Sequence, residues 1–255
     1  MLRVILFAAI VSLIVAPASA RIVVGTDYTA VDSTEAADPE VPTYNWIDPT
    51  SGTDLFSDYQ DDGNGTLPIP FDVSFYGSDY ATGSNIHACT NGWFSFDSTS
   101  TIYSNVVLPN AGEPTTSMCI YWDDLVHRVT ETPRSHIYSY VEGSSPNRIW
   151  VLAFVDIYAF ATYTDPGSFQ MQIYENDGTF NNTIEYHYAD VSLGATGHDS
   201  GESATVGMQN EASTTGITYS SDESVLVDSL AIRFYDHTAS SIKSASLGEI
   251  KAAFK

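Results

Sequence analysis

Short apolar segments separated by turn-forming residues run through most of this sequence, from about residue 44 to residue 236. In the clearest of them Phe169, Met171 and Ile173 alternate with polar residues, which is the two-residue period of a β-strand with one face buried and the other exposed to solvent. The segment is followed by Asn176-Asp177-Gly178, a combination typical of hairpin turns. No long stretch repeats with the period of an α-helix. The pattern therefore predicts an all-β protein.

The number and spacing of these segments indicate how the strands are arranged. About ten segments of this kind, with turn signals at short intervals, favour an antiparallel two-sheet β-sandwich. Residues 149–158 are apolar on both faces, which is expected of a central strand covered on both sides. Hydrophobic residues make up 43% of the chain, enough to fill the core of such a domain.

The N-terminal residues 1–20 have the features of a secretory signal peptide. Arg3 precedes an apolar run of about twelve residues, and Ala18-Ser19-Ala20 is a small-residue cleavage triplet. Cleavage there would make Arg21 the first residue of the mature chain. The run is shorter than the roughly 20 apolar residues of a membrane-spanning helix. We expect an exported protein without a transmembrane segment, secreted or located at the cell surface.

The rest of the chain divides into three regions. Residues 21–43 are polar and acidic and predict an extended lead-in, residues 44–236 form the sandwich, and residues 237–255 form a linker and a short C-terminal helix. Ser246 and Glu249 have the spacing of a helix capping box. This helix would have barely two turns, so we expect its apolar face to dock on the sandwich or on a partner.

A large excess of acidic residues restricts the partners of this chain. It has 32 Asp and Glu against 9 Lys and Arg, a formal net charge of -23. Such a protein is repelled by nucleic acid and by anionic membranes. The expected partner is an extracellular protein or a glycan. The acidity itself fits either bound divalent cations or simple solubility in a salty medium.

Two cysteines, Cys89 and Cys119, occur in a chain expected to be exported into an oxidising environment. A disulfide between them is the expectation. Each lies in an apolar, strand-like segment, so two buried free thiols are the alternative.

Several short sequence phrases, given at the end of this paragraph, occur along the chain in a particular order. That order is more specific to a protein family than any single phrase. This order resembles the nidogen-like extracellular β-sandwich module and its bacterial relatives, over roughly Asp61 to Tyr219. The resemblance implies a β-sandwich used for adhesion, matrix assembly or as an accessory module, and it implies no catalytic residues. The phrases are Asp61-Asp62-Gly63, Phe71 with Phe75-Tyr76-Gly77, Asn91-Gly92-Trp93-Phe94-Ser95-Phe96, Tyr121-Trp122-Asp123-Asp124-Leu125, Phe169-Gln170-Met171-Gln172-Ile173-Tyr174-Glu175 and Ala204-Thr205-Val206-Gly207-Met208-Gln209-Asn210.

The candidate metal ligands are Asp123 and Asp124, with Asn91 as a third. At a strand end both carboxylates can bind Ca²⁺, which takes six to eight oxygen ligands; capping of turn amides is the alternative. Residues 58–65 are also acidic, but Gln60 at the third position does not fit an EF-hand. Two interpretations of residues 58–65 remain, a calcium site of another geometry and an acidic turn.

Aromatic residues are abundant, with 16 Tyr and 4 Trp. Trp93, Trp122 and Tyr163 are candidates for a glycan-stacking platform, although strands also use such rings for core packing. The sequence contains no Gly-x-Ser-x-Gly, His-Glu-x-x-His or phosphate-loop motif. We therefore expect a non-catalytic module that makes adhesive or structural contacts, with Ca²⁺ as its candidate stabilising ion. A carbohydrate-binding module and a hydrolase with an unrecognised site are the alternatives.

Overall fold

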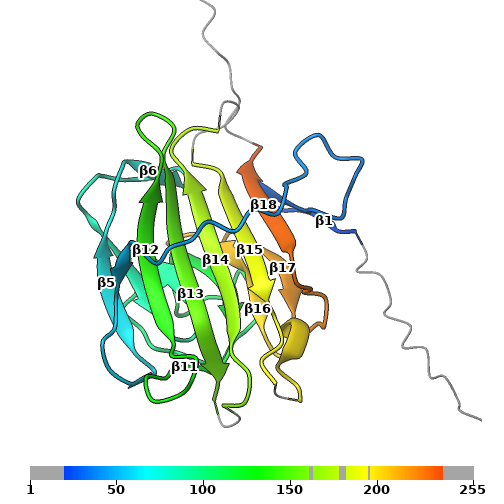
Figure 1. Ribbon diagram of the computed structural model, residues 1–255. Helices are drawn as coiled ribbons and strands as arrows, with labels where there is room; N and C mark the ends of the chain where they lie inside the picture. Colours follow the sequence, from blue (N-terminus) through cyan, green and yellow to red (C-terminus); the bar gives the residue numbers. More distant parts are fainter. Residues whose placement is uncertain (1–19, 161–162, 178–181, 195, 238–255) are drawn as a thin grey trace, which may run out of the picture.

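A computed structural model describes residues 20–160, 163–177, 182–194 and 196–237 of the chain (Figure 1). Over these residues it contains eighteen strands, one short 3₁₀ helix at Asp199–Gly201 and no α-helix. The paired strands run antiparallel and form sheets of ten, six and two strands. The predicted all-β, antiparallel fold is confirmed.

The large sheet contains both the longest strands and several very short ones. Its order is β1-β2-β18-β15-β14-β13-β11-β4, and β12 pairs with both β13 and β3. The strands are β1 (Ile22–Val24), β2 (Tyr28–Asp32), β3 (Thr53–Asp54), β4 (Gln60–Asp61), β11 (Leu125–His127), β12 (His136–Glu142), β13 (Ile149–Ala159), β14 (Gly167–Tyr174), β15 (Ile184–Asp190) and β18 (Leu230–Asp236).

The six-stranded sheet forms the second layer. Its order is β17-β16-β10-β9-β8-β5, and β6 and β7 form a separate hairpin. The strands are β5 (Asn64–Pro68), β6 (Val73–Phe75), β7 (Ser78–Tyr80), β8 (Asn85–Cys89), β9 (Trp93–Ser95), β10 (Ser117–Trp122), β16 (Thr205–Gln209) and β17 (Gly216–Ser221).

The main core lies between the two sheets and takes its residues mostly from the inward-facing sides of the longer strands. Phe169 and Met171 of β14 and Phe94 and Met118 of the small sheet belong to the same buried cluster. Phe94 contacts Phe154 with ring centroids 5.2 Å apart. The alternation seen in the sequence therefore marks the inward face of β14, as predicted.

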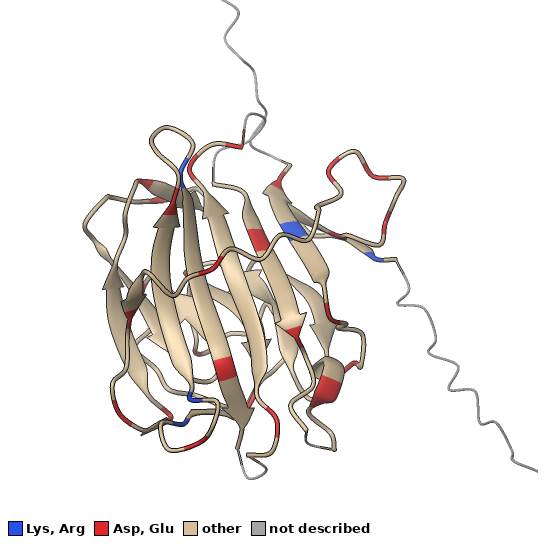
Figure 2. Cartoon of the chain, viewed as in Figure 1, with Lys and Arg blue, Asp and Glu red and all other residues tan. Residues whose placement is uncertain are grey.

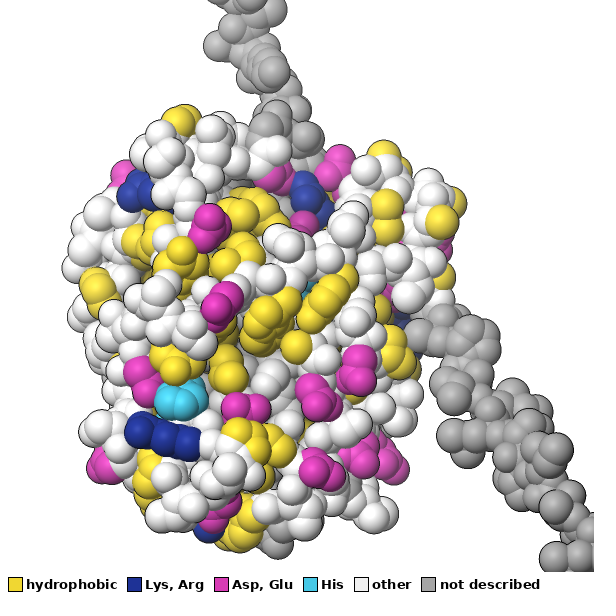
Figure 3. Space-filling view, viewed as in Figure 1, with side chains coloured by type: hydrophobic (Ala, Val, Ile, Leu, Met, Phe, Trp, Pro, Cys, Tyr) yellow, Lys and Arg dark blue, Asp and Glu magenta, His cyan; other side chains and the backbone are white. Residues whose placement is uncertain are grey.

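The other face of the large sheet is also covered, which the sequence predicted for residues 149–158 of β13 but not for β14. Residues 41–49 cross the outside of β12 to β15 (Figure 1), and space-filling shows apolar side chains around this crossing segment (Figure 3). Gln170 donates through Nε2 to the Ile47 carbonyl at 3.1 Å, and Gln172 to the Asn45 carbonyl at 2.7 Å. Both glutamines are fully buried. The expectation of a solvent-facing side for β14 was wrong because this segment covers it.

The expected number of strands, about ten, was also too low. Seven strands have only two or three residues, too few for an alternating pattern to be recognised. Two further strands lie within residues 21–43, the region expected to be an extended lead-in. Here β2 is buried along its whole length and pairs with β18, and β1 pairs with β2.

Three further expectations concern the chain ends. Most of the expected signal peptide, residues 1–19, lies outside the described residues, as does the expected C-terminal helix within residues 238–255. Over the residues with described structure, no helix is both long and apolar enough to cross a membrane. Acidic side chains are concentrated in the loops and at strand ends, with few basic ones among them (Figure 2).

Candidate functional site

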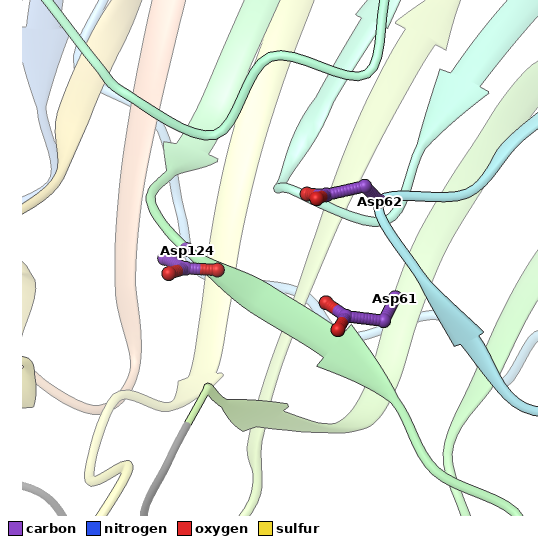
Figure 4. A group of neighbouring side chains, drawn as sticks. All are labelled: Asp61, Asp62 and Asp124. Atoms are coloured by element: carbon purple, nitrogen blue, oxygen red, sulfur yellow. The ribbon is translucent and has the colours of Figure 1, made fainter.

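Three carboxylates meet at one end of the sandwich, where the chain crosses between the sheets. Asp61 ends β4, Asp62 follows it, and Asp124 lies between β10 and β11. The pairing of β4 with β11, which sets Asp61 opposite Val126, brings these segments together. Each residue offers one oxygen within 4.8 Å of the others, and the carboxylates face one another (Figure 4).

The negative charges of the three carboxylates disfavour the ionised form of Asp124, the most buried of the three. Partial burial of Asp124 and the nearby negative charges of Asp62, Asp61 and Asp123 raise its pKa to about 6, while His198 acts in the opposite direction. A carboxyl pKa above its ordinary value means that the ionised form is destabilised in the folded protein. The positive charge of a divalent cation bound between the carboxylates would offset this repulsion. Carboxylate oxygens are ligands that Ca²⁺ prefers.

Asn91 positions one carboxylate of the cluster by a hydrogen bond, and its own side-chain oxygen is used by a backbone N–H. Its Nδ2 donates to Asp62 Oδ1 at 2.7 Å, and its Oδ1 accepts the backbone N–H of Leu125 at 2.9 Å. Asn91 sits in the tight turn between β8 and β9, where Gly92 has φ +78°. The amide therefore fixes the position of the Asp62 carboxylate next to the start of β11.

Asp123 is directed away from the cluster. Its Oδ2 accepts from His198 Nδ1 at 2.9 Å and from Ser203 Oγ at 2.5 Å. Of the predicted ligands Asp123, Asp124 and Asn91, only Asp124 joins the carboxylate group. Asp61 and Asp62 were missed as its partners, although the acidic composition of residues 58–65 was the signal that pointed to them.

The Asp123, His198 and Ser203 side chains have the composition of a hydrolase triad but not its geometry. Ser203 Oγ lies 3.0 Å from His198 Nδ1, the same ring nitrogen that contacts Asp123. A serine nucleophile and its carboxylate must contact opposite nitrogens of the histidine, so that the ring can transfer the proton. This arrangement instead ties residues 198–203 to the end of β10. Tyr121 supports it by donating to the His198 carbonyl.

The expected disulfide is absent, and both thiols are free and buried. Cys89 and Cys119 both pair with Trp93, one from each neighbouring strand, so a whole strand separates them. Two strand spacings place their Cα atoms about 9–10 Å apart, beyond the roughly 7 Å that a disulfide spans. Burial raises the pKa of each thiol to about 12. The alternative of two buried thiols therefore holds.

The proposed glycan-stacking rings are not available as a platform. Trp93 and Trp122 are both 0% exposed, and their indole N–H groups donate to the same carbonyl, that of Ile102, at 3.2 and 3.1 Å. The guanidinium of Arg128 lies over the ring of Tyr163, 4.0 Å from its centroid. The two indoles serve the core packing that was the alternative.

The loop that covers these indoles carries a cluster of exposed apolar side chains, which we call the apolar strip. The loop joins β9 to β10 across the outside of the six-stranded sheet, and residues 98–112 within it contain no charged residue. Exposure of the strip reaches 48% at Tyr103 and 60% at Val107. The apolar strip consists of Ile102, Tyr103, Val106 and Val107.

Hydrogen bonds hold the loop against the sheet. Asn105 Nδ2 donates to Thr205 Oγ1 at 3.0 Å, and Leu108 exchanges hydrogen bonds with Thr218 Oγ1 through its N–H and its carbonyl, at 2.8 and 2.7 Å. Leu108 is itself buried, in one cluster with Trp93 and Trp122. The apolar strip is thus a fixed feature of the surface whose side chains face outward.

A cavity of about 500 Å³ lies beside the β6–β7 hairpin. Two of the carboxylates that line it have partners within the domain. Glu175 forms an ion pair with Arg148 at 2.7 Å, and Asp72 accepts two hydrogen bonds from Thr82. These two carboxylates on the cavity wall therefore already hold neighbouring segments together.

The chain matches a known protein family. A family model described as NIDO related matches residues 36–242. No curated protein and no solved structure matches significantly. The matched region contains the apolar strip and the carboxylate cluster.

Proposed function

From the premise that the chain belongs to the NIDO-related family, we propose that it is an exported, non-catalytic binding domain that contacts another extracellular protein through the apolar strip. The resemblance to nidogen-like modules supports an adhesive or structural role, and the signal-like residues 1–20 support export. The observation that carries the proposal is the apolar strip itself.

The apolar strip has the composition of the centre of a protein interface. Such centres are depleted of charged residues and enriched in aromatic ones. In a chain with a net charge of -23, the charge-free residues 98–112 form a surface on which a partner meets no charged side chain of this segment. Because hydrogen bonds already order the loop, little conformational entropy is lost on binding. Asp97 and Glu113 flank these residues in the sequence and Asp222 accepts a hydrogen bond from Asn105, so a partner with a basic rim would complement the edge of the strip.

Ca²⁺ is proposed as a stabiliser of the same domain. Asp61 and Asp62 lie where the chain passes from β4 of the large sheet to β5 of the small one, and Asp124 where it passes from β10 back to β11. An ion held by all three would connect two crossovers between the sheets. It would also relieve the repulsion that raises the pKa of Asp124.

The alternatives have less support. A carbohydrate-binding role would use exposed, coplanar rings, whereas two of the three candidate rings are buried. A hydrolase would use a histidine placed between its acid and its nucleophile, whereas Asp123 and Ser203 contact the same nitrogen of His198. The proposal therefore retains the binding role.

A cell-binding assay tests the proposal. Fluorescently labelled mature protein is added to the cells that export it, and bound protein is measured by flow cytometry. We expect saturable binding that protease treatment of the cells abolishes and periodate treatment leaves intact. Val107→Asp should reduce the affinity by tenfold or more, because it places a charge in the interface centre. Val227→Asp, at another exposed apolar residue, is the matched control and should bind normally.

Two outcomes contradict the proposal. Binding that survives protease and is lost on periodate treatment would indicate a glycan partner. Equal affinity of Val107→Asp and the wild-type protein would show that the apolar strip is not the contact surface.

A further inference from the structure

A buried carboxylate lies at the end of β2, next to the first described residues of the chain. Asp32 is 1% exposed and its two oxygens accept four hydrogen bonds. Oδ1 accepts from the backbone N–H and the hydroxyl of Thr34, at 2.8 and 2.6 Å. Oδ2 accepts from the Tyr219 hydroxyl at 2.8 Å and from the backbone nitrogen of Arg21 at 2.9 Å.

All four of these donors are neutral in the uncleaved chain. The nearest guanidinium, that of Arg21, is directed elsewhere: it donates to the Tyr219 carbonyl and pairs with Glu223 at 2.6 Å. Among the ion pairs of the described residues, none involves Asp32. A buried carboxylate without a cationic partner is costly, because burial removes its hydration.

The Arg21 nitrogen is also the atom that removal of residues 1–20 would expose. We propose that processing between Ala20 and Arg21 creates an ammonium group that forms a buried ion pair with Asp32 and fixes the N-terminal strand. The inference rests on the export that the proposed function includes. In the cleavage, water adds to the Ala20 carbonyl carbon and the C–N bond to Arg21 breaks. Ala20 leaves as a carboxylate, and the Arg21 nitrogen becomes a protonated amine.

The geometry needs no rearrangement for this pair. The nitrogen is already 2.9 Å from Asp32 Oδ2, and Ala20 is exposed, so its removal leaves solvent to hydrate the remaining N–H groups. The pair would hold β1 in its register with β2, where Ile22 is opposite Val31. β1 is the terminal strand of the large sheet, and among the described strands it pairs only with β2. Val24, at its other end, is 72% exposed.

Three versions of the protein test the ion pair. One begins at Arg21, produced from a fusion whose protease leaves no extra residue. The second begins at Ala18, so it keeps an ammonium group but displaces it by three residues. The third carries Arg21→Ala at its first position, which keeps the ammonium and removes the guanidinium. We expect the Arg21 form to melt at least about 4 °C above the Ala18 form. The Arg21→Ala form should retain most of that difference.

Asp32→Asn in both the Arg21 and the Ala18 forms should remove the difference in melting temperature between them. Equal melting temperatures of the two unsubstituted forms, or a difference that persists with Asp32→Asn, would overturn the proposal.

The pH dependence gives a second test that needs no substitution. The groups facing the ammonium are Asp32, Tyr219, Glu223 and the guanidinium of Arg21. An α-amino group has an ordinary pKa of about 7.7–8.0, and pairing with a carboxylate raises it in the folded state. The added stability is therefore fully present below about pH 7.7 and is lost as the pH rises through the folded-state pKa. A difference between the two forms that stays constant up to pH 11 would contradict the ion pair.

A mass measurement separates this inference from the proposed function. The intact mass of the protein recovered outside the cells that export it should correspond to a chain that begins at Arg21. Another first residue would overturn the processing site. These results are independent of the apolar strip, so a failure of cell binding with the expected N-terminus would reject the proposed partner contact and leave the ion pair in place.

Discussion

Replacement of Asp124 by Asn should stabilise the protein without divalent cations and destabilise it relative to wild type when Ca²⁺ is present. The pKa of Asp124 rises from its ordinary 3.8 to about 6, because of burial and of the charges of Asp62, Asp61 and Asp123. That rise corresponds to about 3 kcal/mol, which partial exposure reduces to about 1–2 kcal/mol. Asn has nearly the same shape and no charge, so it should recover this amount at pH 7.5 in EDTA.

The pH dependence of the wild-type protein has a defined sign. The folded state holds the Asp124 proton more tightly than the unfolded state, so between about pH 4 and 6 the folded state binds more protons. The contribution of this group to stability is therefore present at low pH and is lost as the pH rises through about 6. Asp124→Asn should lack this dependence.

Urea unfolding followed by tryptophan fluorescence measures both effects. Wild type, Asp124→Asn and the control Asp79→Asn are compared in EDTA and in millimolar Ca²⁺ at fixed ionic strength. Asp79 is an exposed acidic residue of the β6–β7 hairpin, so its replacement removes the same charge elsewhere. Ca²⁺ should stabilise wild type and Asp79→Asn with saturation, and Asp124→Asn by much less. A loss of stability in Asp124→Asn in EDTA, or equal stabilisation of all three proteins by Ca²⁺, would refute this reasoning.

Three further predictions concern two buried thiols, a glycine in a tight turn and the arginine that pairs with a buried glutamate. Cys89 and Cys119 should react with a thiol reagent only after denaturation, and reduction should leave the melting temperature unchanged; one native disulfide by mass would contradict this. Gly92→Ala should destabilise the fold by about 3 kcal/mol or more in urea unfolding. Gly92 has φ +78°, and a Cβ there would lie 1.9 Å from the Tyr121 backbone oxygen. A loss under about 1 kcal/mol would show that this turn can relax. Arg233→Met should lower the free energy of unfolding by about 3–5 kcal/mol in the same assay. The substitution removes the guanidinium that forms an ion pair with the buried Glu185 at 2.9 Å. Unchanged stability would mean that other donors compensate.

The fold class was predictable from the sequence because alternation is a local property of each strand. The inward positions of Phe169, Met171 and Ile173 follow directly from it. What covers the outward face is not local: Gln170 and Gln172 look solvent-facing, and only the crossing of residues 41–49 buries them. Polar residues in a strand can therefore mark a segment that packs over the sheet.

The candidate site was predicted only in part for the same reason. Asp124 was identified, but its partners depend on the pairing of β4 with β11, and a two-residue strand leaves no pattern in the sequence. The expectation of a disulfide was wrong because the order of the strands sets the distance between the two cysteines. β9 lies between the strands that carry Cys89 and Cys119, and its Trp93 pairs with both. Residue type indicated the chemistry available, and the strand order determined which groups meet.

Hydrogen–deuterium exchange of the mature protein, free and bound to the envelope fraction of the exporting cells, tests the binding role most directly. The account predicts that protection on binding is concentrated in peptides covering residues 98–112, and that Val107→Asp eliminates it. Protection confined to the opposite sheet, with residues 98–112 exchanging as fast as in the free protein, would contradict the claim that the apolar strip is the contact surface.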